Sequence, residues 1–125
     1  MSADPTHGLL EVEHFGARTV GRFVRRTILE SAAIEAVGTR LHALVRDEGR
    51  RLLVLNFARV ESVTSGLFGT FVALQKEVEA GGGRLVFCNV DTFLAEIFRI
   101  CQLPTQITVY PDEAEALRSL EAPPA

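Results

Sequence analysis

The chain has 125 residues, a net charge of −3 at pH 7, and 47% hydrophobic against 23% charged residues. This balance predicts one soluble globular domain spanning residues 1–125, with its core at about 9–120 and flexible ends at 1–7 and 121–125. The sequence has no basic stripe, which argues against binding to nucleic acid or anionic lipid. It also has no basic leader followed by an apolar block, so we expect no signal peptide. No apolar run approaches the roughly 20 residues that cross a bilayer, so we expect no membrane association and a cytoplasmic location.

The first third of the chain predicts a hairpin followed by a helix. The segments LLEVEHF and ARTVGRFV lie on either side of Gly16 and alternate as two short strands. In SAAIEAVGTRLHALVRDEG, apolar residues recur at helical spacing. We expect Ser31 to cap the amino end of this helix and Gly49 to stop it.

A central strand is predicted by LLVLNF, residues 52–57. A nearly unbroken apolar run is typical of a strand that is covered on both faces. Because side chains alternate along a strand, we expect Leu53 and Leu55 on one face and Val54 on the other, all substantially buried.

The second half of the chain predicts helices alternating with strands. One helix ends at the glycines 81–83, and the buried strand RLVFCNV follows it. Asp91 or Thr92 is expected to cap the helix FLAEIFRICQ, which Pro104 closes. The strand QITVY and the helix EAEALRSL, capped by Asp112, come last. The apolar face of the helix before the glycines consists of Leu67, Phe71, Leu74 and Val78.

This order of elements, β-β-α-β-α-β-α-β-α, predicts an α/β domain. Strands that alternate with helices pair in parallel through right-handed crossovers, and the hairpin adds an antiparallel edge. We therefore expect a single mixed, mostly parallel sheet of four to five strands with about four helices.

Residue patterns that carry catalysis or bind metals are missing from the sequence. His7, His14 and His42 have no partner at ligand spacing. No histidine follows His42, which excludes the residue order of a hydrolase triad, and no glycine-rich phosphate loop is present. Cys88 and Cys101 lie in apolar runs and predict buried free thiols. We expect a protein that is not an enzyme and that uses no metal or cofactor.

The junction between the strand 52–57 and the next helix predicts a docking surface. Functional groups in open α/β sheets collect beyond the carboxyl ends of the strands, and a helix start favours anions. A simple N-cap would also explain Thr64 or Ser65. Gly66 and Gly69, however, each cost about 1 kcal/mol within a helix, and their spacing clears one face for a partner. Gly69 has an alternative role in packing against a neighbouring strand.

The loop after the strand RLVFCNV is expected to flank this junction, because both follow parallel strands at one edge of the sheet. The predicted partner-binding residues are Val63, Thr64, Ser65, Gly66, Leu67, Gly69, Asn89, Asp91 and Thr92.

The run LLVLNFARVESVTSGLFGTFVALQKEVEAGGGRLVFCNV resembles the STAS domain, the family of bacterial anti-sigma factor antagonists. The similarity continues through FLAEIFRICQLPTQITVYPDEAEAL and covers roughly residues 10–118. It implies partner switching: the protein binds an anti-sigma factor, commonly an ATP-binding serine kinase, and frees the sigma factor. The kinase phosphorylates the second hydroxyl residue of the junction, and a phosphatase reverses this. By position the phosphoacceptor is Ser65, with Thr64 as the alternative.

The sequence departs from the family pattern at three points. Val63 stands where the family has an aspartate in its phosphorylatable signature, and Asn56 stands where the preceding strand is often followed by aspartate. The segment RFVRRTILES also differs from the common Gly-x-Leu-Asp-like turn.

Two alternatives to a phosphorylated antagonist remain open. The first is a STAS scaffold that is never phosphorylated and acts by constitutive binding or self-association. The second is a module that senses a nucleotide or anion at the amino end of the second helix, although Glu61 would repel such a ligand. We expect a monomer or a weak homodimer.

Overall fold

The computed structural model describes residues 8–28, 30–63, 65–100 and 107–121. Within these ranges, five strands form one sheet in the order β1-β2-β4-β6-β7, and two short strands, β3 and β5, form a second sheet. The strands are β1 (Leu10–Phe15), β2 (Arg18–Phe23), β3 (Thr27–Ile28), β4 (Leu52–Asn56), β5 (Ser62–Val63), β6 (Arg84–Cys88) and β7 (Thr108–Tyr110). The helices are α1 (Ser31–Arg46), α2 (Ser65–Ala80), α3 (Thr92–Ile100) and α4 (Glu113–Ser119).

The pairing of the main sheet confirms the predicted mixed topology. Strands β1 and β2 are antiparallel and meet at Gly16, whose φ of 61° allows the tight turn. The β2–β4, β4–β6 and β6–β7 pairs are all parallel. The carboxyl ends of β2, β4, β6 and β7 therefore lie at one edge of the sheet, and the segments that leave this edge can form a common surface.

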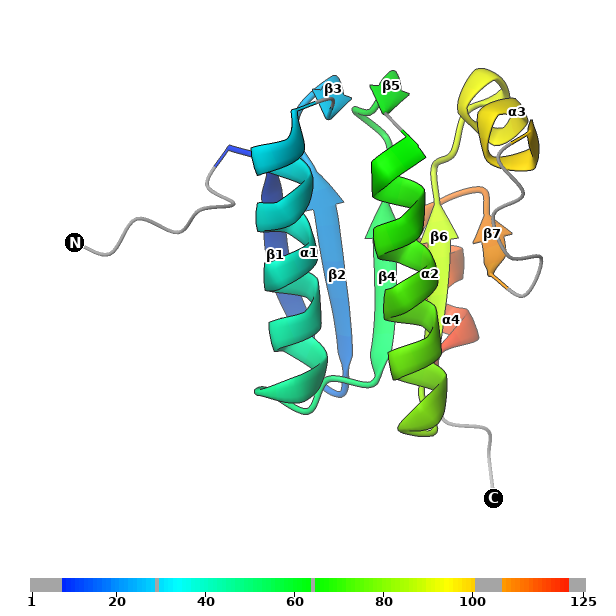
Figure 1. The fold of residues 1–125 in the computed structure, drawn as a ribbon. Helices are drawn as coiled ribbons and strands as arrows, with labels where there is room; N and C mark the ends of the chain where they lie inside the picture. Colours follow the sequence, from blue (N-terminus) through cyan, green and yellow to red (C-terminus); the bar gives the residue numbers. More distant parts are fainter. Residues whose placement is uncertain (1–7, 29, 64, 101–106, 122–125) are drawn as a thin grey trace.

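Helices cover both faces of the sheet, as the apolar run of β4 predicts. Figure 1 shows α1 and α2 side by side on one face and α4 on the other. Leu53 and Leu55 belong to the larger core cluster, with the buried residues of α1, α2 and α3. Val54 belongs to a smaller cluster with Ala116 and Leu120 beneath α4. All three β4 residues are at most 1% exposed, which confirms the predicted alternation.

The N-cap of α1 is not Ser31, as predicted, but the residue before it. The cap residue is Glu30, which makes no side-chain capping hydrogen bond, and Ser31 is the first residue of the helix. The carboxyl end of α1 agrees with the prediction that Gly49 stops the helix. The helix ends at Arg46, and Gly49, with a φ of 66°, lets the Arg50 N–H donate to the Leu44 carbonyl at 2.9 Å.

The later helices begin with aspartate caps. Asp91 accepts a hydrogen bond from the Leu94 N–H at 2.7 Å, so Asp91 rather than Thr92 caps α3. Asp112 accepts one from the Glu115 N–H at 2.8 Å and caps α4. The predicted stop at Pro104 lies outside the described residues.

The two-residue strands β3 and β5 were not predicted. They pair in parallel, Thr27 with Ser62 and Ile28 with Val63, just beyond the ends of β2 and β4 (Figure 1). The Arg26 carbonyl accepts the Glu61 N–H at 2.7 Å and begins this ladder. The pairing places residues 27–28, which belong to the segment that departs from the family pattern, directly beside residues 62–63 at the start of the junction.

Candidate docking surface

Helix α2 begins at Ser65, directly after β5, at the edge where the parallel strands end (Figure 1). This confirms the predicted strand-to-helix junction, while Thr64 and the Ser65 side chain lie outside the described residues. Gly66 and Gly69 are exposed. Among the described residues, a Cβ atom added at Gly69 would meet no heavy atom within 4 Å, so the alternative that Gly69 packs against a strand of the described sheets is wrong. This face of α2 is open.

Two of the predicted partner-binding residues lie in the core instead. Leu67 is 0% exposed and Val63 is 9% exposed, and both belong to the main hydrophobic cluster. In this conformation both side chains are unavailable to a partner, and their assignment as partner-binding residues stays a prediction. The period of the helix explains Leu67, because it shares the apolar face of α2 with Phe71 and Leu74.

The loop that follows β6 lies at the same edge, but two of its side chains have structural tasks. Asn89 has a φ of 56°, which ends β6 two residues earlier than predicted, and its side-chain amide donates to the Asn56 side-chain oxygen at 3.2 Å. Asp91 is exposed, yet its carboxylate caps α3. Thr92 is exposed at the first position of α3. Of these three residues, Thr92 has its side chain most available to a partner.

An aromatic cluster fixes α3 against the start of α2. The rings of Phe68 on α2 and Phe98 on α3 meet edge to face, with centroids 5.2 Å apart. Phe57, directly after β4, contacts Phe98 at 5.6 Å, Phe71 at 5.6 Å and Phe87 at 4.9 Å. Edge-to-face contacts of this kind add to the area burial of the rings. The buried rings therefore hold α3 beside the first turns of α2.

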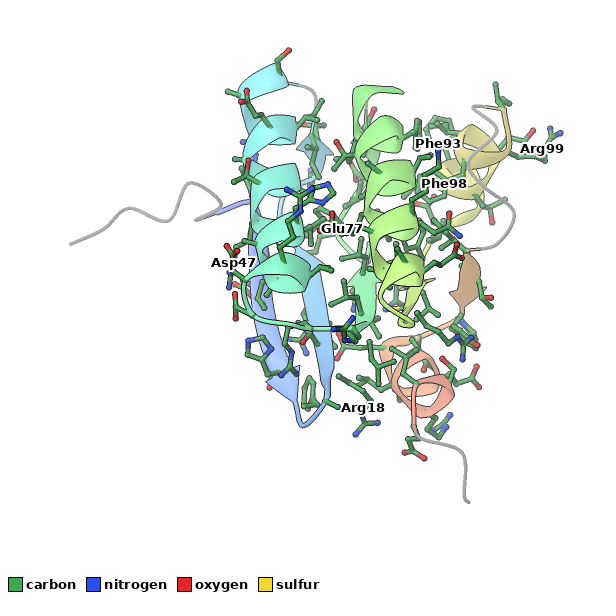
Figure 2. All side chains as sticks on the ribbon, turned by 60° about the horizontal axis from the view of Figure 1, so that its bottom comes forward. Arg18, Asp47, Glu77, Phe93, Phe98 and Arg99 are labelled. Atoms are coloured by element: carbon green, nitrogen blue, oxygen red, sulfur yellow. The ribbon has the colours of Figure 1, made fainter. Side chains whose placement is uncertain are left out.

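Helix α3 also carries an exposed apolar stripe that sequence reasoning missed. Phe93 is 65% exposed and Ile100 is 67% exposed, and the half-buried Ile97 lies between them at helical spacing. Figure 2 shows Phe93 and Phe98 on α3, with Arg99 projecting outward. The signal was present in the sequence, since TFLAEIFRI has more apolar positions than one buried stripe with Leu94 and Phe98 can use.

Sequence reasoning likewise missed a cluster of polar side chains at the end of β4, here called the polar node, which consists of Arg22, Asn56 and Glu113. The Asn56 side-chain oxygen accepts hydrogen bonds from the Ala58 N–H at 2.9 Å and from the Asn89 side-chain amide at 3.2 Å. The Asn56 side-chain nitrogen donates to the Glu113 carboxylate of α4 at 3.0 Å. One side chain at the end of β4 thus contacts both loops of the edge and the helix on the opposite face.

Arg22 of β2 clamps this node. Its Nε and one terminal nitrogen each donate to an oxygen of Glu113 at 2.8 Å, and its other terminal nitrogen donates to Glu13 at 2.7 Å. The hydrogen bonds from Arg22 lower the pKa of Glu113, although burial acts in the opposite direction. The same hydrogen bonds raise the pKa of Arg22. The bidentate pair therefore stays ionised at neutral pH.

The cysteine predictions are confirmed where they fall on described residues. Cys88 is a free thiol with 0% exposure, and burial, followed by the nearby Glu113 and Asp112 carboxylates, raises its pKa to about 12. A neutral, buried thiol is chemically inert. Cys101 lies outside the described residues. Among the described residues, no group of three or more His, Cys, Asp or Glu side chains is arranged to hold a metal ion, and no helix is both long and apolar enough to span a membrane.

A second charged cluster joins α1 to α2 away from this edge. Figure 2 shows Glu77 of α2 beside α1, where its carboxylate contacts His42 and accepts a hydrogen bond from Arg46 at 2.7 Å. Burial alone would raise the pKa of Glu77, but the hydrogen bonds from His42 and Arg46 outweigh it and lower the pKa.

We therefore expect the domain to lose stability in acid, partly through Glu77. A carboxylate whose pKa is lowered by folding stabilises the native state above the unfolded value of about 4.3, and this contribution is lost as pH falls through the lowered native pKa. Denaturant unfolding of the wild type measured from pH 7 to pH 3 should show this decrease. Glu77→Gln should lower stability at pH 7 and flatten the decrease, whereas the exposed Glu35→Gln should change neither. Equal pH dependence in wild type and Glu77→Gln would contradict the assignment.

Comparison with known proteins confirms the resemblance seen in the sequence. The model of the STAS domain family matches residues 23–116. An anti-sigma-factor antagonist (STAS) domain protein from Planctomyces limnophilus is 19% identical, with a TM-score of 0.78 and coverage of 89% of this chain and 96% of that one. An anti-sigma factor antagonist from Mycobacterium paratuberculosis is 18% identical, with a TM-score of 0.77 and coverage of 90% and 93%.

The Bacillus cell fate determinant SpoIIAA, in its phosphorylated form, is 19% identical, with a TM-score of 0.68 and coverage of 88% of this chain and 98% of that one. At these identities the solved structures show a shared fold, and the family model adds the sequence pattern over most of the chain. The chain belongs to the STAS domain family.

Proposed function

We propose that this protein is an anti-sigma factor antagonist-like regulatory module, without enzymatic activity of its own, that acts in the cytoplasm. It binds an anti-sigma factor of the ATP-binding serine kinase type and so releases a sigma factor. Phosphorylation of Ser65 by that kinase breaks the complex, and a phosphatase restores the binding form. Structures that share the fold are described as anti-sigma factor antagonists, and SpoIIAA is described in a phosphorylated form, which supports this role.

The observation that carries the proposal is the open start of α2 beside the exposed stripe of α3. Gly66 and Gly69 leave the backbone of α2 accessible, and Phe93, Ile97 and Ile100 add apolar surface on the neighbouring helix. Apolar and aromatic side chains at the centre of a contact supply most of the binding energy in protein interfaces. A partner could thus approach the backbone of α2 closely at the glycines and bury apolar side chains of α3 in the same contact.

Gly69→Arg tests this surface. The site has open space for a side chain, and replacing a helical glycine by arginine improves helix propensity by about 0.5–1 kcal/mol, so the fold is retained. The long charged side chain occupies the space of the partner and should reduce affinity at least about tenfold, or about 1.4 kcal/mol. Calorimetric titration with candidate kinase-type anti-sigma factors measures the effect.

Ala80→Arg provides the matched control on the same helix. Ala80 is exposed at the last position of α2, about 16 Å along the helix axis from Gly69. It should bind the partner like the wild type. Equal affinity of wild type and Gly69→Arg, with both folded, would move the interface away from the start of α2.

A further inference from the structure

The geometry points to Asn56 as a positioning residue of the docking surface, held in place by Glu113 from the opposite face of the sheet. This inference rests on the proposed function, because it concerns how the same surface is shaped. Asn56 is half-buried at the last position of β4, where the chain leaves the sheet toward the junction.

The two acceptor bonds of Asn56 fix both loops of the edge. The bond from the Ala58 N–H, at 2.9 Å, turns the chain that leads from β4 toward β5 and α2. The bond from the Asn89 side chain, at 3.2 Å, holds the residue whose left-handed φ of 56° redirects the chain from β6 into α3. Asparagine enters this region more readily than other non-glycine residues, and the bond from its side chain to Asn56 fixes where this turn lies. Asn56 thus ties the loop after β6 to the loop after β4.

The donor bond of Asn56 links these loops to α4. Its side-chain nitrogen lies 3.0 Å from the Glu113 carboxylate, which Arg22 holds in a bidentate pair. The amide must point its nitrogen at Glu113, and this orientation directs its oxygen at Ala58 and Asn89. Glu113 therefore selects the orientation of Asn56 that both loops require.

This arrangement explains why asparagine suits position 56 here. An aspartate would place a second carboxylate about 3 Å from that of Glu113, and like charges at this distance repel strongly in a half-buried site. With Glu113 in α4, the end of β4 needs a side chain that donates on one side and accepts on the other. Asparagine meets both requirements.

Asn56→Asp and the exchanged pair Asn56→Asp with Glu113→Gln test the inference. In the single variant the carboxylate at position 56 has no N–H to donate to Glu113 and is repelled by its charge, so amide hydrogen exchange at Ala58 and Asn89 should accelerate at least tenfold. In the double variant the side-chain amide at position 113 donates to the carboxylate at position 56, so the two carboxylates no longer repel each other. The remaining oxygen at position 113 still accepts from a terminal nitrogen of Arg22, and the bidentate pair is reduced to one hydrogen bond. Exchange at both backbone amides should then return to within about threefold of the wild type. Affinity for a kinase-type anti-sigma factor should fall and recover in parallel.

Leu44→Ala is the control for general loss of stability. Leu44 is 1% exposed near the carboxyl end of α1, at the opposite end of the sheet from the two loops (Figure 1), so this variant lowers global stability without altering the hydrogen bonds of Asn56. The inference is overturned if Leu44→Ala accelerates exchange at Ala58 and Asn89 as much as Asn56→Asp does, or if the double variant fails to restore these amides. A wild type that binds no kinase would contradict the proposed function alone, and the exchange rates would still decide the role of Asn56.

Discussion

Val54→Asp is expected to unfold the domain. Val54 is 0% exposed at the centre of the main sheet, between its register partners Val20 of β2 and Val86 of β6, with α4 above it. A carboxyl group at this site would have to be neutral, and burying a neutral polar group without a partner costs about 1–3 kcal/mol. Losing the buried valine adds about 1.5–3 kcal/mol. The sum is a large part of the roughly 5–15 kcal/mol that stabilises a typical domain.

Urea denaturation followed by circular dichroism measures this effect. Val109→Asp is the matched control, because Val109 lies in β7 of the same sheet but is 48% exposed. The control should unfold near the wild-type midpoint, and Val54→Asp should show no cooperative transition or one at much lower urea. A Val54→Asp protein with the wild-type midpoint would contradict the central position of β4.

Ser65→Asp is expected to have the largest effect on partner binding. Ser65 is the first residue of α2, so a negative charge there is compatible with the helix itself. A partner surface built for a neutral group would have to bury an unpaired charge, which costs about 2–5 kcal/mol. This corresponds to at least about a 30-fold loss of affinity. Ser65→Ala should bind nearly like the wild type but should no longer respond to the kinase.

Intact-mass spectrometry after incubation with the cognate kinase and ATP tests the regulation directly. One added phosphate that Ser65→Ala abolishes and Thr64→Ala retains would support the switch. The aspartate that the family has at position 63 is replaced by valine, which folds into the core at 9% exposure. If the wild type gains no phosphate and Val63→Asp does, the protein has kept the scaffold and lost the switch.

The main elements of the fold could be predicted because each depends on a local pattern. The apolar run of β4, the helical spacing of Leu67 and Phe71, and the glycines after α2 all specify elements that the structure confirms. Strands β3 and β5 could not be predicted, since two residues carry no periodicity. They pair only because β2 and β4, which precede them, end side by side. Their existence is a product of the sheet and not of their own sequence.

The candidate site was less predictable for the same reason. The start of α2 and the open space at Gly69 follow from local signals. The node of Arg22, Asn56 and Glu113 joins residues up to 91 positions apart, and no local pattern brings them together. Leu67 belongs both to the family motif and to the apolar face of α2, and in the structure the helical period places it in the core.

The edges of the main sheet restrict how a partner can recognise this protein. The outer strand β1 bears the exposed charges of Glu11 and Glu13, and the opposite outer strand, β7, is only three residues long. Charged side chains and short length both hinder another chain from extending a sheet by strand addition. On the proposed docking surface, specificity then depends on side chains of α2 and α3, whose substitution leaves the backbone pairing of the sheet unchanged.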